Sequence, residues 1–319
     1  MADRRASPAT AKGILWTAAG AALLLGSALA SAPAQAGDCE EVAQSQLTAC
    51  RASALDDYWI AIATCDNDAA DDPQSLCPKA ASQDLAAARA DCADQLDARR
   101  QICAQLGGGK YDPVIDPKNF GASTNISNPY FPLKPGTTFV YEGNTADGLE
   151  HDEFQVTRRT HTFLGVKCVE VHDRVTLDGK LTEDTLDWFA QDNAGNVWYF
   201  GEQSFQVEDG IVIGIEGSWQ AGADDAKPGI IMEAKSKVGD NYRQEYKISD
   251  AEDNAEVIQT GQSVNVHGKA YTNVLVTHEF SGLEPSANER KFYAPNVGNV
   301  LTIDDETGDR SELVKITTF

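Results

Sequence analysis

Six of the seven cysteines lie in the first third of the chain, at positions 39, 50, 65, 77, 92 and 103. Thiols can oxidise to disulfides or, as thiolates, bind a metal ion. The spacings of 11, 15, 12, 15 and 11 residues are symmetrical, and the outer, middle and inner pairs of positions each add up to 142. Pairs of constant sum are the register of two antiparallel segments. The spacing therefore predicts three disulfides: Cys39–Cys103, Cys50–Cys92 and Cys65–Cys77.

A thiolate metal site is the alternative for these cysteines. Such a site needs closely spaced ligands, but the chain has no Cys-x-x-Cys pair and no histidine before residue 151. Disulfides are therefore favoured. Cys168, left over after three pairs, is expected to be a small buried core residue rather than a nucleophile.

Helices fit the cysteine spacing better than strands. Eleven residues advance a helix by about three turns plus 20°, and fifteen by about four turns plus 60°, which keeps each set of three cysteines on one side. The stretch "DNDAADDPQ" supplies turn residues around position 71, Pro78 suits the first turn of a helix, and the glycines at 107 to 109 end one. We predict a disulfide-stapled helical hairpin over residues 37–106, followed by a linker over 107–128.

Residues 129–319 have a different texture. Short runs rich in Val, Thr, Tyr and Phe alternate with turn residues such as Asp178-Gly179, Asp209-Gly210 and His267-Gly268. Helical segments of useful length are absent from the pattern. The chain is thus predicted to be an α+β protein, in which the α-hairpin precedes a large antiparallel β-meander curled as a half-barrel or barrel.

One predicted sheet face carries groups that could bind a ligand. If Asp178-Gly179 is a two-residue turn, Glu170 and His172 share a face with Asp187 and Phe189, and the "DNAG" turn adds two aromatic residues. Apolar walls with a few polar anchors are typical of a small-molecule site, whereas ordinary cross-strand pairs are the alternative. The irregular stretch 217–234 is a candidate lid. The candidate ligand-binding residues are Glu170, His172, Asp187, Phe189, Trp198, Phe200 and Trp219.

Catalytic and metal chemistry have less support. His172 near Asp187 could be an oriented base, but neither G-x-S-x-G nor H-E-x-x-H occurs, so no catalytic residue is predicted and an enzyme is not favoured. The acidic turns at 192–196 and 304–309 could hold calcium, but neither matches the twelve-residue calcium loop. We expect no cofactor and no metal site, with calcium at these turns as the alternative.

The amino-terminal residues and the charge indicate export. Residues 1–36 have the basic, apolar and small-residue order of a secretory signal peptide, and an uncleaved anchor is the alternative. The chain has 49 acidic and 26 basic residues, a formal net charge of −23, which repels nucleic acid and favours cations or basic partners. We expect a periplasmic or extracellular protein without a stable membrane span after signal cleavage.

Three stretches carry a resemblance to a known group of proteins: "NPYFPLKPGTTFVYEG", "LDWFAQDNAGNVWYFGE" and "KFYAPNVGNVLTI". Over about residues 129–319 the chain resembles secreted bacterial proteins whose sheet is similar to the half-barrel of periplasmic lipoprotein carriers. The cysteine hairpin lies outside the resemblance. The resemblance implies a fold and export, and it brings no catalytic residue.

Three functions are compatible with these features. The favoured one is an exported binding protein whose half-barrel holds a small apolar or amphipathic ligand or a partner segment, with the hairpin as a docking module. The second is a secreted hydrolase that uses carboxylates, His172 or a divalent cation. The third is a structural envelope or surface protein that associates with another envelope protein.

Overall fold

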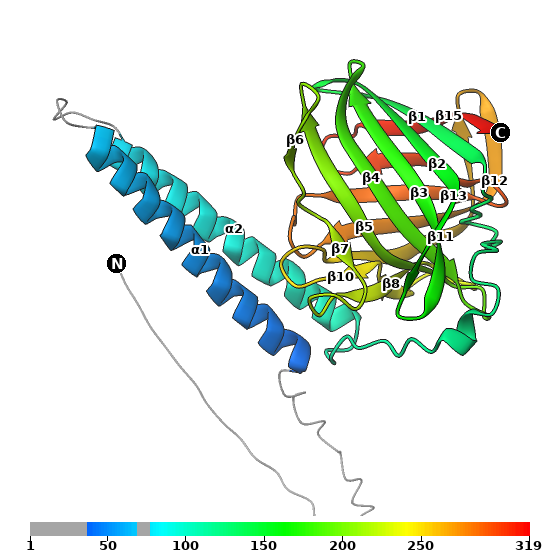
Figure 1. Ribbon diagram of the computed structural model, residues 1–319, viewed down its shortest axis with the longest axis horizontal. Helices are drawn as coiled ribbons and strands as arrows, with labels where there is room; N and C mark the ends of the chain where they lie inside the picture. Colours follow the sequence, from blue (N-terminus) through cyan, green and yellow to red (C-terminus); the bar gives the residue numbers. More distant parts are fainter. Residues whose placement is uncertain (1–36, 69–76) are drawn as a thin grey trace, which may run out of the picture. The chain divides into compact units, whose positions relative to one another are not determined.

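The computed structural model describes residues 37–68 and 77–319. Within them the chain forms two helices, a short 3₁₀ turn and fifteen strands (Figure 1). The predicted signal peptide and most of the predicted turn around residue 71 lie outside the described residues.

The two helices are α1 (Asp38–Asp68) and α2 (Cys77–Gln105). The first turn of α1 carries three acidic residues, which interact favourably with the positive end of the helix dipole. Helix α2 ends before Gly107 and Gly108, whose φ angles are 86° and 75°. This left-handed conformation is favourable for glycine and terminates the helix.

All three predicted disulfides are present, and they join α1 to α2. Their Cα–Cα separations are 5.7, 5.8 and 5.7 Å for Cys39–Cys103, Cys50–Cys92 and Cys65–Cys77. The core between the helices is small, consisting of Ala43, Leu47, Cys92 and Leu96 with Cys50 packed against it. Each disulfide is expected to contribute roughly 2–4 kcal/mol, chiefly by restricting the unfolded chain. The predicted stapled hairpin is confirmed.

The strands follow the 3₁₀ turn η1 (Pro117–Phe120). Their bounds are β1 (Thr137–Thr145), β2 (Gly148–Phe163), β3 (Val166–Leu177), β4 (Lys180–Gln191), β5 (Val197–Glu208), β6 (Ile211–Gly214), β7 (Trp219–Gln220), β8 (Lys227–Met232), β9 (Asn241–Arg243), β10 (Glu245–Tyr246), β11 (Asp253–Val266), β12 (Lys269–Ser281), β13 (Asn288–Ala294), β14 (Gly298–Asp304) and β15 (Arg310–Thr318).

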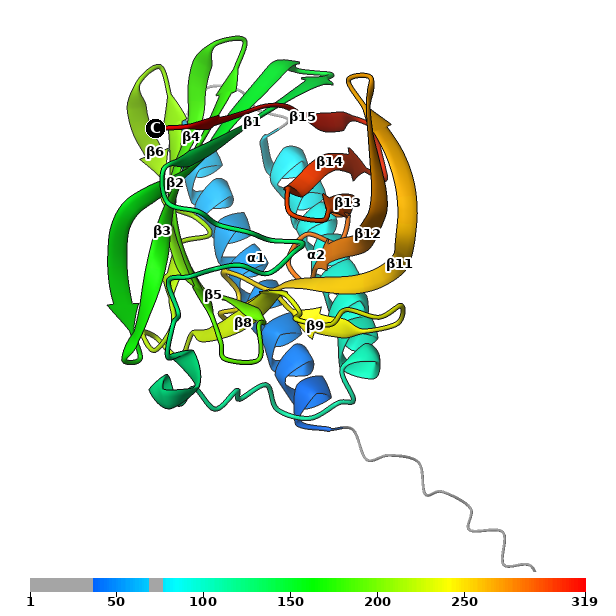
Figure 2. The ribbon, with the colours of Figure 1, turned by 90° about the vertical axis from the view of Figure 1, so that its right-hand side faces the viewer.

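The strands form one antiparallel sheet in the order β10-β8-β5-β4-β3-β2-β1-β15-β14-β13-β12-β11-β9, with β6 and β7 also paired to β5. Strands β9 and β10 are separated only by Gln244, yet β9 pairs with β11 and β10 pairs with β8. Both ends of the sheet therefore meet at one short stretch, and the sheet is a nearly closed barrel. Figure 2 shows β2 to β5 on one wall and β11 to β14 on the opposite wall. The predicted fold class is confirmed.

The predicted two-residue turn at Asp178-Gly179 is present, with φ angles of 49° and 77° at its two central residues. Such positive angles match the twist of a hairpin. The predicted register beyond this turn is wrong, because a β-bulge shifts the pairing between Val175 and Thr176. The extra residue is Thr182, whose hydroxyl donates to the carbonyl oxygen of Val175 at 3.1 Å. A shift of one residue moves every later side chain of β4 to the other face relative to β3.

The next hairpin is also shifted by one residue. Gln191 pairs with Val197, and the side chain of Asp192 accepts hydrogen bonds from the N–H groups of Ala194, Gly195 and Asn196. This cap holds a loop one residue longer than predicted. As a result Tyr199, not Trp198, lies opposite Phe189.

The segment predicted to be a linker is part of the barrel's packing. Phe120 is buried, and its ring lies 6.2 Å from that of Trp198 and 5.8 Å from that of Phe200. Phe120 thus packs on the outer face of β5. The prediction that residues 217–234 are irregular is wrong, since this stretch contains β7 and β8, both of which pair with β5.

The hairpin is tied to the barrel by a buried ion pair. Arg99 of α2 donates to Glu252 at 2.7 Å, and the two side chains are 6% and 3% exposed. Gln46 of α1 donates to the same carboxylate, as does the N–H of Ser249. Because several donors meet one buried carboxylate, this contact fixes the two helices to the loop before β11.

Candidate functional site

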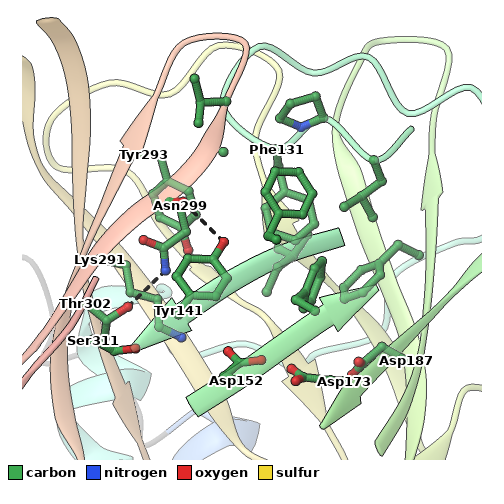
Figure 3. Close-up of a pocket in the computed structure, with 18 of the residues that line it drawn as sticks. Phe131, Tyr141, Asp152, Asp173, Asp187, Lys291, Tyr293, Asn299, Thr302 and Ser311 are labelled. Carbon is green, nitrogen blue, oxygen red and sulfur yellow. Dashed lines mark hydrogen bonds between the residues drawn. The ribbon is translucent and has the colours of Figure 1, made fainter. Parts of the chain in front are cut away.

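The barrel encloses a cavity of about 350 Å³ (Figure 3). Residues of β1 to β5, β8 and β13 to β15 line it, together with the loop residues Phe131, Pro132 and Leu133. Along each strand, inward-pointing side chains alternate with outward-pointing ones. The inward-pointing side chains form the wall of the cavity, and the outward-pointing ones pack on the other face of the sheet.

One wall of the cavity is aromatic. The ring of Phe131 lies 5.4 Å from that of Phe189, which in turn stacks on Tyr199 at 4.7 Å and an interplanar angle of 14°. The ring of Trp219 meets Tyr199 edge-on at 5.4 Å, and Tyr293 lies 6.4 Å from Phe131. These rings offer a rigid apolar surface of the kind that binds hydrocarbon or aromatic groups.

The other end of the cavity is acidic. Asp152 of β2, Asp173 of β3 and Asp187 of β4 lie next to one another below the aromatic rings (Figure 3). In each carboxyl group one buried oxygen has no hydrogen-bond donor among the described residues. A buried carboxylate oxygen without a partner is costly, so this arrangement lowers the stability of the barrel.

The three aspartates hold protons more strongly than exposed ones. Burial raises the pKa of Asp152 well above its ordinary value, and the negative charge of Asp173 and a hydrogen bond between the two groups raise it further. Burial likewise raises the pKa of Asp173. The pKa of Asp187 is raised well above its ordinary value by burial and then by the charge of Glu202.

A tyrosine hydroxyl bridges two of the carboxyl groups. Tyr199 lies 2.6 Å from Oδ1 of Asp187 and 3.0 Å from Oε2 of Glu202. The hydroxyl has one proton to donate, so both contacts can be hydrogen bonds only when one of the two carboxyl groups is protonated. Burial raises the pKa of Glu202 to about 8, which fits a proton held at this place.

Lys291 is already paired. Its ammonium group lies 3.0 Å from Glu279 and 3.3 Å from Glu289. Burial alone would lower its pKa, but the charges of these two carboxylates raise it well above the ordinary value. Lys291 therefore makes its ion pairs with these two glutamates, although it lines the same cavity as the three aspartates and its charge acts on Asp173.

A second chamber of about 420 Å³ adjoins the first and shares Glu289 and Lys291 with it. Its lining is far more acidic than that of the first chamber. Burial raises the pKa values of Glu245 and Asp253 as well as that of Glu202. The carboxyl groups that line it belong to Glu183, Glu202, Glu216, Glu245, Asp250, Asp253, Glu279, Glu284 and Glu289.

The structure brings together only part of the predicted site. Asp187 and Phe189 line the cavity, whereas Trp219 is not a lining residue: it packs edge-on against Tyr199 and donates to Glu245 at 2.7 Å. The bulge at Thr182 places Glu170 and His172 on the outer face instead, opposite Trp188 and Leu186. The prediction that they share a face with Asp187 is wrong.

Trp198 and Phe200 also lie away from the cavity. Both contact Phe120 on the outer face of β5, because the longer loop capped by Asp192 shifts the register. The indole N–H of Trp198 donates to Asp192 at 3.0 Å. These two aromatic residues stabilise the turn and the outer core.

Two of the histidine and carboxylate pairs on the outer face involve residues of the predicted site. Nε2 of His172 lies 2.6 Å from Asp184, not from Asp187 as predicted, and Nε2 of His161 lies 2.7 Å from the buried Glu170. His161 is also the cross-strand partner of Cys168. That thiol is fully buried and burial raises its pKa, the opposite of what activates a nucleophile.

In the acidic turns, aspartate carboxylate oxygens accept hydrogen bonds from backbone N–H groups. Asp304 accepts from the N–H groups of Glu306 and Thr307, as Asp192 does in its own turn. Within residues 37–68 and 77–319, no group of three or more His, Cys, Asp or Glu side chains is arranged to hold a metal ion.

The sequence did not single out Asp152, Asp173, Tyr199 or Lys291. A signal was present, since Asp152 and Phe154 alternate with exterior residues along β2, as Lys291 and Tyr293 do along β13. Finding the cavity from this alternation would have required knowing where the barrel closes, which depends on strands far apart in the chain.

No protein-family model matches this chain, and no curated protein or solved structure is significantly similar to it. None of the helices that the structure describes is long and apolar enough to cross a membrane. Three disulfides are typical of proteins in an oxidising environment, such as the periplasm or the outside of the cell.

Proposed function

We propose that this is an exported binding protein that holds a small amphipathic molecule inside the barrel. A volume of about 350 Å³ is within the range of small-molecule sites. The aromatic wall suits a hydrocarbon or aromatic body, and the acidic end suits a polar group.

The observation that carries this proposal is the set of three aspartates with unpartnered oxygens beside stacked aromatic rings. A barrel that served only as a scaffold would be more stable with apolar residues at Asp152, Asp173 and Asp187. Groups that reduce stability are typical of binding and catalytic sites, where a ligand supplies the missing contacts.

Binding is supported better than hydrolysis. The histidine and carboxylate pairs lie on the outer face and not in the cavity, and the thiol nearest to them is buried with a raised pKa. The cavity itself contains acids and tyrosines but no histidine among its lining residues.

Association with another envelope protein is a second candidate, favoured by the apolar residues of β6 and its neighbour. Ile211, Val212, Ile213 and Ile215 are 66%, 53%, 63% and 62% exposed. Among the strands that the structure describes, β6 pairs only with β5, so its other edge is open to a further strand. Trp59 and Ile60, each 59% exposed on α1, would make the hairpin a docking module.

Native mass spectrometry of protein purified from its exporting host is the first test. We expect a bound molecule of low mass that is lost on unfolding. Titration calorimetry with phenylpropanol, which is neutral and small, gives a second measure. Thr302→Phe should fill the cavity and abolish binding, whereas Thr318→Phe, at an exposed threonine, should not. Absence of any bound molecule together with no binding of phenylpropanol would refute the proposed function.

A further inference from the structure

We propose, building on the binding function above, that the polar end of the ligand is an ammonium group. In this arrangement Asp187 holds the ammonium group together with Asp152 and Asp173, while the aromatic wall contacts the hydrocarbon body (Figure 3). The ligand class is a small amphipathic amine.

Asp187 is the strongest indication. Asp187 is only 6% exposed and lines the cavity, and its Oδ1 accepts a hydrogen bond from the hydroxyl of Tyr199 at 2.6 Å. Its Oδ2 is buried and has no donor among the described residues. An ammonium group brings up to three N–H donors and a charge of the right sign to such an oxygen.

The balance of charge in the cavity also favours a cation. Within the described part of the chain, the lining carries Glu150, Asp152, Asp173, Asp187 and Glu289 against a single basic residue, Lys291. Lys291 makes its ion pairs with Glu279 and Glu289, and although its charge also acts on Asp173, none of the ion pairs among the described residues joins a cation to the three aspartates. An anionic ligand would be repelled, and a neutral alcohol would supply one donor and no charge.

The aromatic rings suit the same ligand. The faces of Phe, Tyr and Trp rings attract cations through their quadrupoles, and the attraction grows when water is excluded. Phe189 lies two residues after Asp187 on β4, and both side chains line the cavity. A group placed there contacts ring faces on one side and carboxyl oxygens on the other.

Binding of a cation next to Asp187 is coupled to the release of protons from the surrounding carboxyl groups. The groups that act on Asp187 are Tyr199 and Glu202 from β5, Asp173 from β3, Glu183 from β4 itself and Glu245 from β10. The same cavity is lined by Glu150 and Asp152 from β2 and by Glu289 and Lys291 from β13. With the cavity empty, protons neutralise part of this charge, and an entering ammonium group displaces them.

The test compares two probes of matched size and shape, phenylpropylamine and phenylpropanol, by titration calorimetry of the full protein at pH 8. We expect the amine to bind at least about tenfold more tightly than the alcohol. Asp187→Asn, which keeps the shape of the side chain, should reduce that advantage to less than about threefold.

The matched control is Asp184→Asn, which changes a carboxylate of the same strand on the outer face and should keep the full advantage of the amine. Circular dichroism establishes that each variant is folded. Equal binding of amine and alcohol by the unaltered protein would overturn the inference and leave the proposed function standing. Binding of neither probe would overturn the inference, and together with the absence of a bound molecule in native mass spectrometry it would overturn the proposed function as well. An amine advantage that persists in Asp187→Asn would overturn the role assigned to Asp187.

Discussion

The hairpin and the barrel keep their folds in different ways. The hairpin has a core of a few small residues and depends on three disulfides. The barrel has a large apolar core and, among its described residues, no disulfide, with Cys168 buried as a free thiol. The barrel can therefore tolerate side chains that lower its stability, whereas the hairpin cannot.

This difference shows where function can reside. The barrel's interior contains at least three carboxyl groups with unpartnered oxygens, and their cost is offset by buried residues such as Val171, Phe200 and Leu275. Unsatisfied groups surrounded by a well-packed core are preorganised, because the ligand does not have to order the side chains that receive it. The predictions that follow test this contrast, from the largest expected effect to the smallest.

The hairpin and the barrel should depend on each other for stability at their junction, where they share the Arg99–Glu252 ion pair. Glu252→Ala leaves the buried guanidinium of Arg99 without its partner and should lower the free energy of unfolding by about 3–5 kcal/mol. Denaturant unfolding followed by circular dichroism measures it. The double variant Arg99→Met with Glu252→Met should recover much of the loss. A cost below about 1 kcal/mol for the single variant would show that the two parts are energetically independent.

Removal of one disulfide should destabilise the hairpin without affecting ligand binding by the barrel. Replacing both Cys50 and Cys92 with alanine removes a disulfide that joins positions 42 residues apart. This change should lower the free energy of unfolding of the hairpin by roughly 2–4 kcal/mol. We expect helical signal to be lost at a lower temperature, while phenylpropanol binding by the barrel stays within about twofold of the unaltered protein. Loss of binding in a variant whose barrel remains folded would show that the hairpin shapes the cavity.

Asp187→Asn should stabilise the barrel at high pH. The pKa of Asp187 in the fold lies above the unfolded value, so its contribution to stability is greatest below the unfolded pKa and is lost as the pH rises through the folded pKa. The variant should gain about 1 kcal/mol or more over the unaltered protein at pH 8 and almost nothing at pH 4. Thermal unfolding across this range measures the gain. Parallel stability curves for the two proteins would contradict it.

Exposed ion pairs of the barrel should matter least. Arg174 contacts Glu153 on the barrel with both side chains about half exposed, 47% and 39%. Arg174→Ala should change the free energy of unfolding by less than about 1 kcal/mol, and the change should shrink further in high salt. A larger cost would mean that the barrel depends on surface charge and not on its core.

The hairpin could be predicted residue by residue from the sequence because the disulfide-forming cysteines determine how its two helices pair. Cysteine positions that sum to a constant leave little freedom in the pairing. The barrel offers no such record, and each hairpin fixes its own register through turns and bulges. Because the single extra residue Thr182 was not foreseen, the prediction placed Glu170 and His172 on the same face as Asp187; of these candidates, Asp187 and Phe189 do line the cavity.

The rest of the candidate site could not be predicted because its parts come from opposite sides of the barrel. Asp152 on β2 and Lys291 on β13 are brought to one cavity only by closure of the sheet at β9 and β10. Local periodicity shows that such residues alternate with exterior ones, but not which interior residues meet.

The most direct test of the central claim is the number of protons released when phenylpropylamine binds. Calorimetry at pH 7 in two buffers of different ionisation enthalpy measures that number. Because the pKa of Glu202 is about 8 and those of the neighbouring aspartates are raised, we expect release of at least about half a proton per amine bound, and affinity that increases from pH 6 to pH 8. Amine binding with no proton release and an affinity independent of pH would contradict the account.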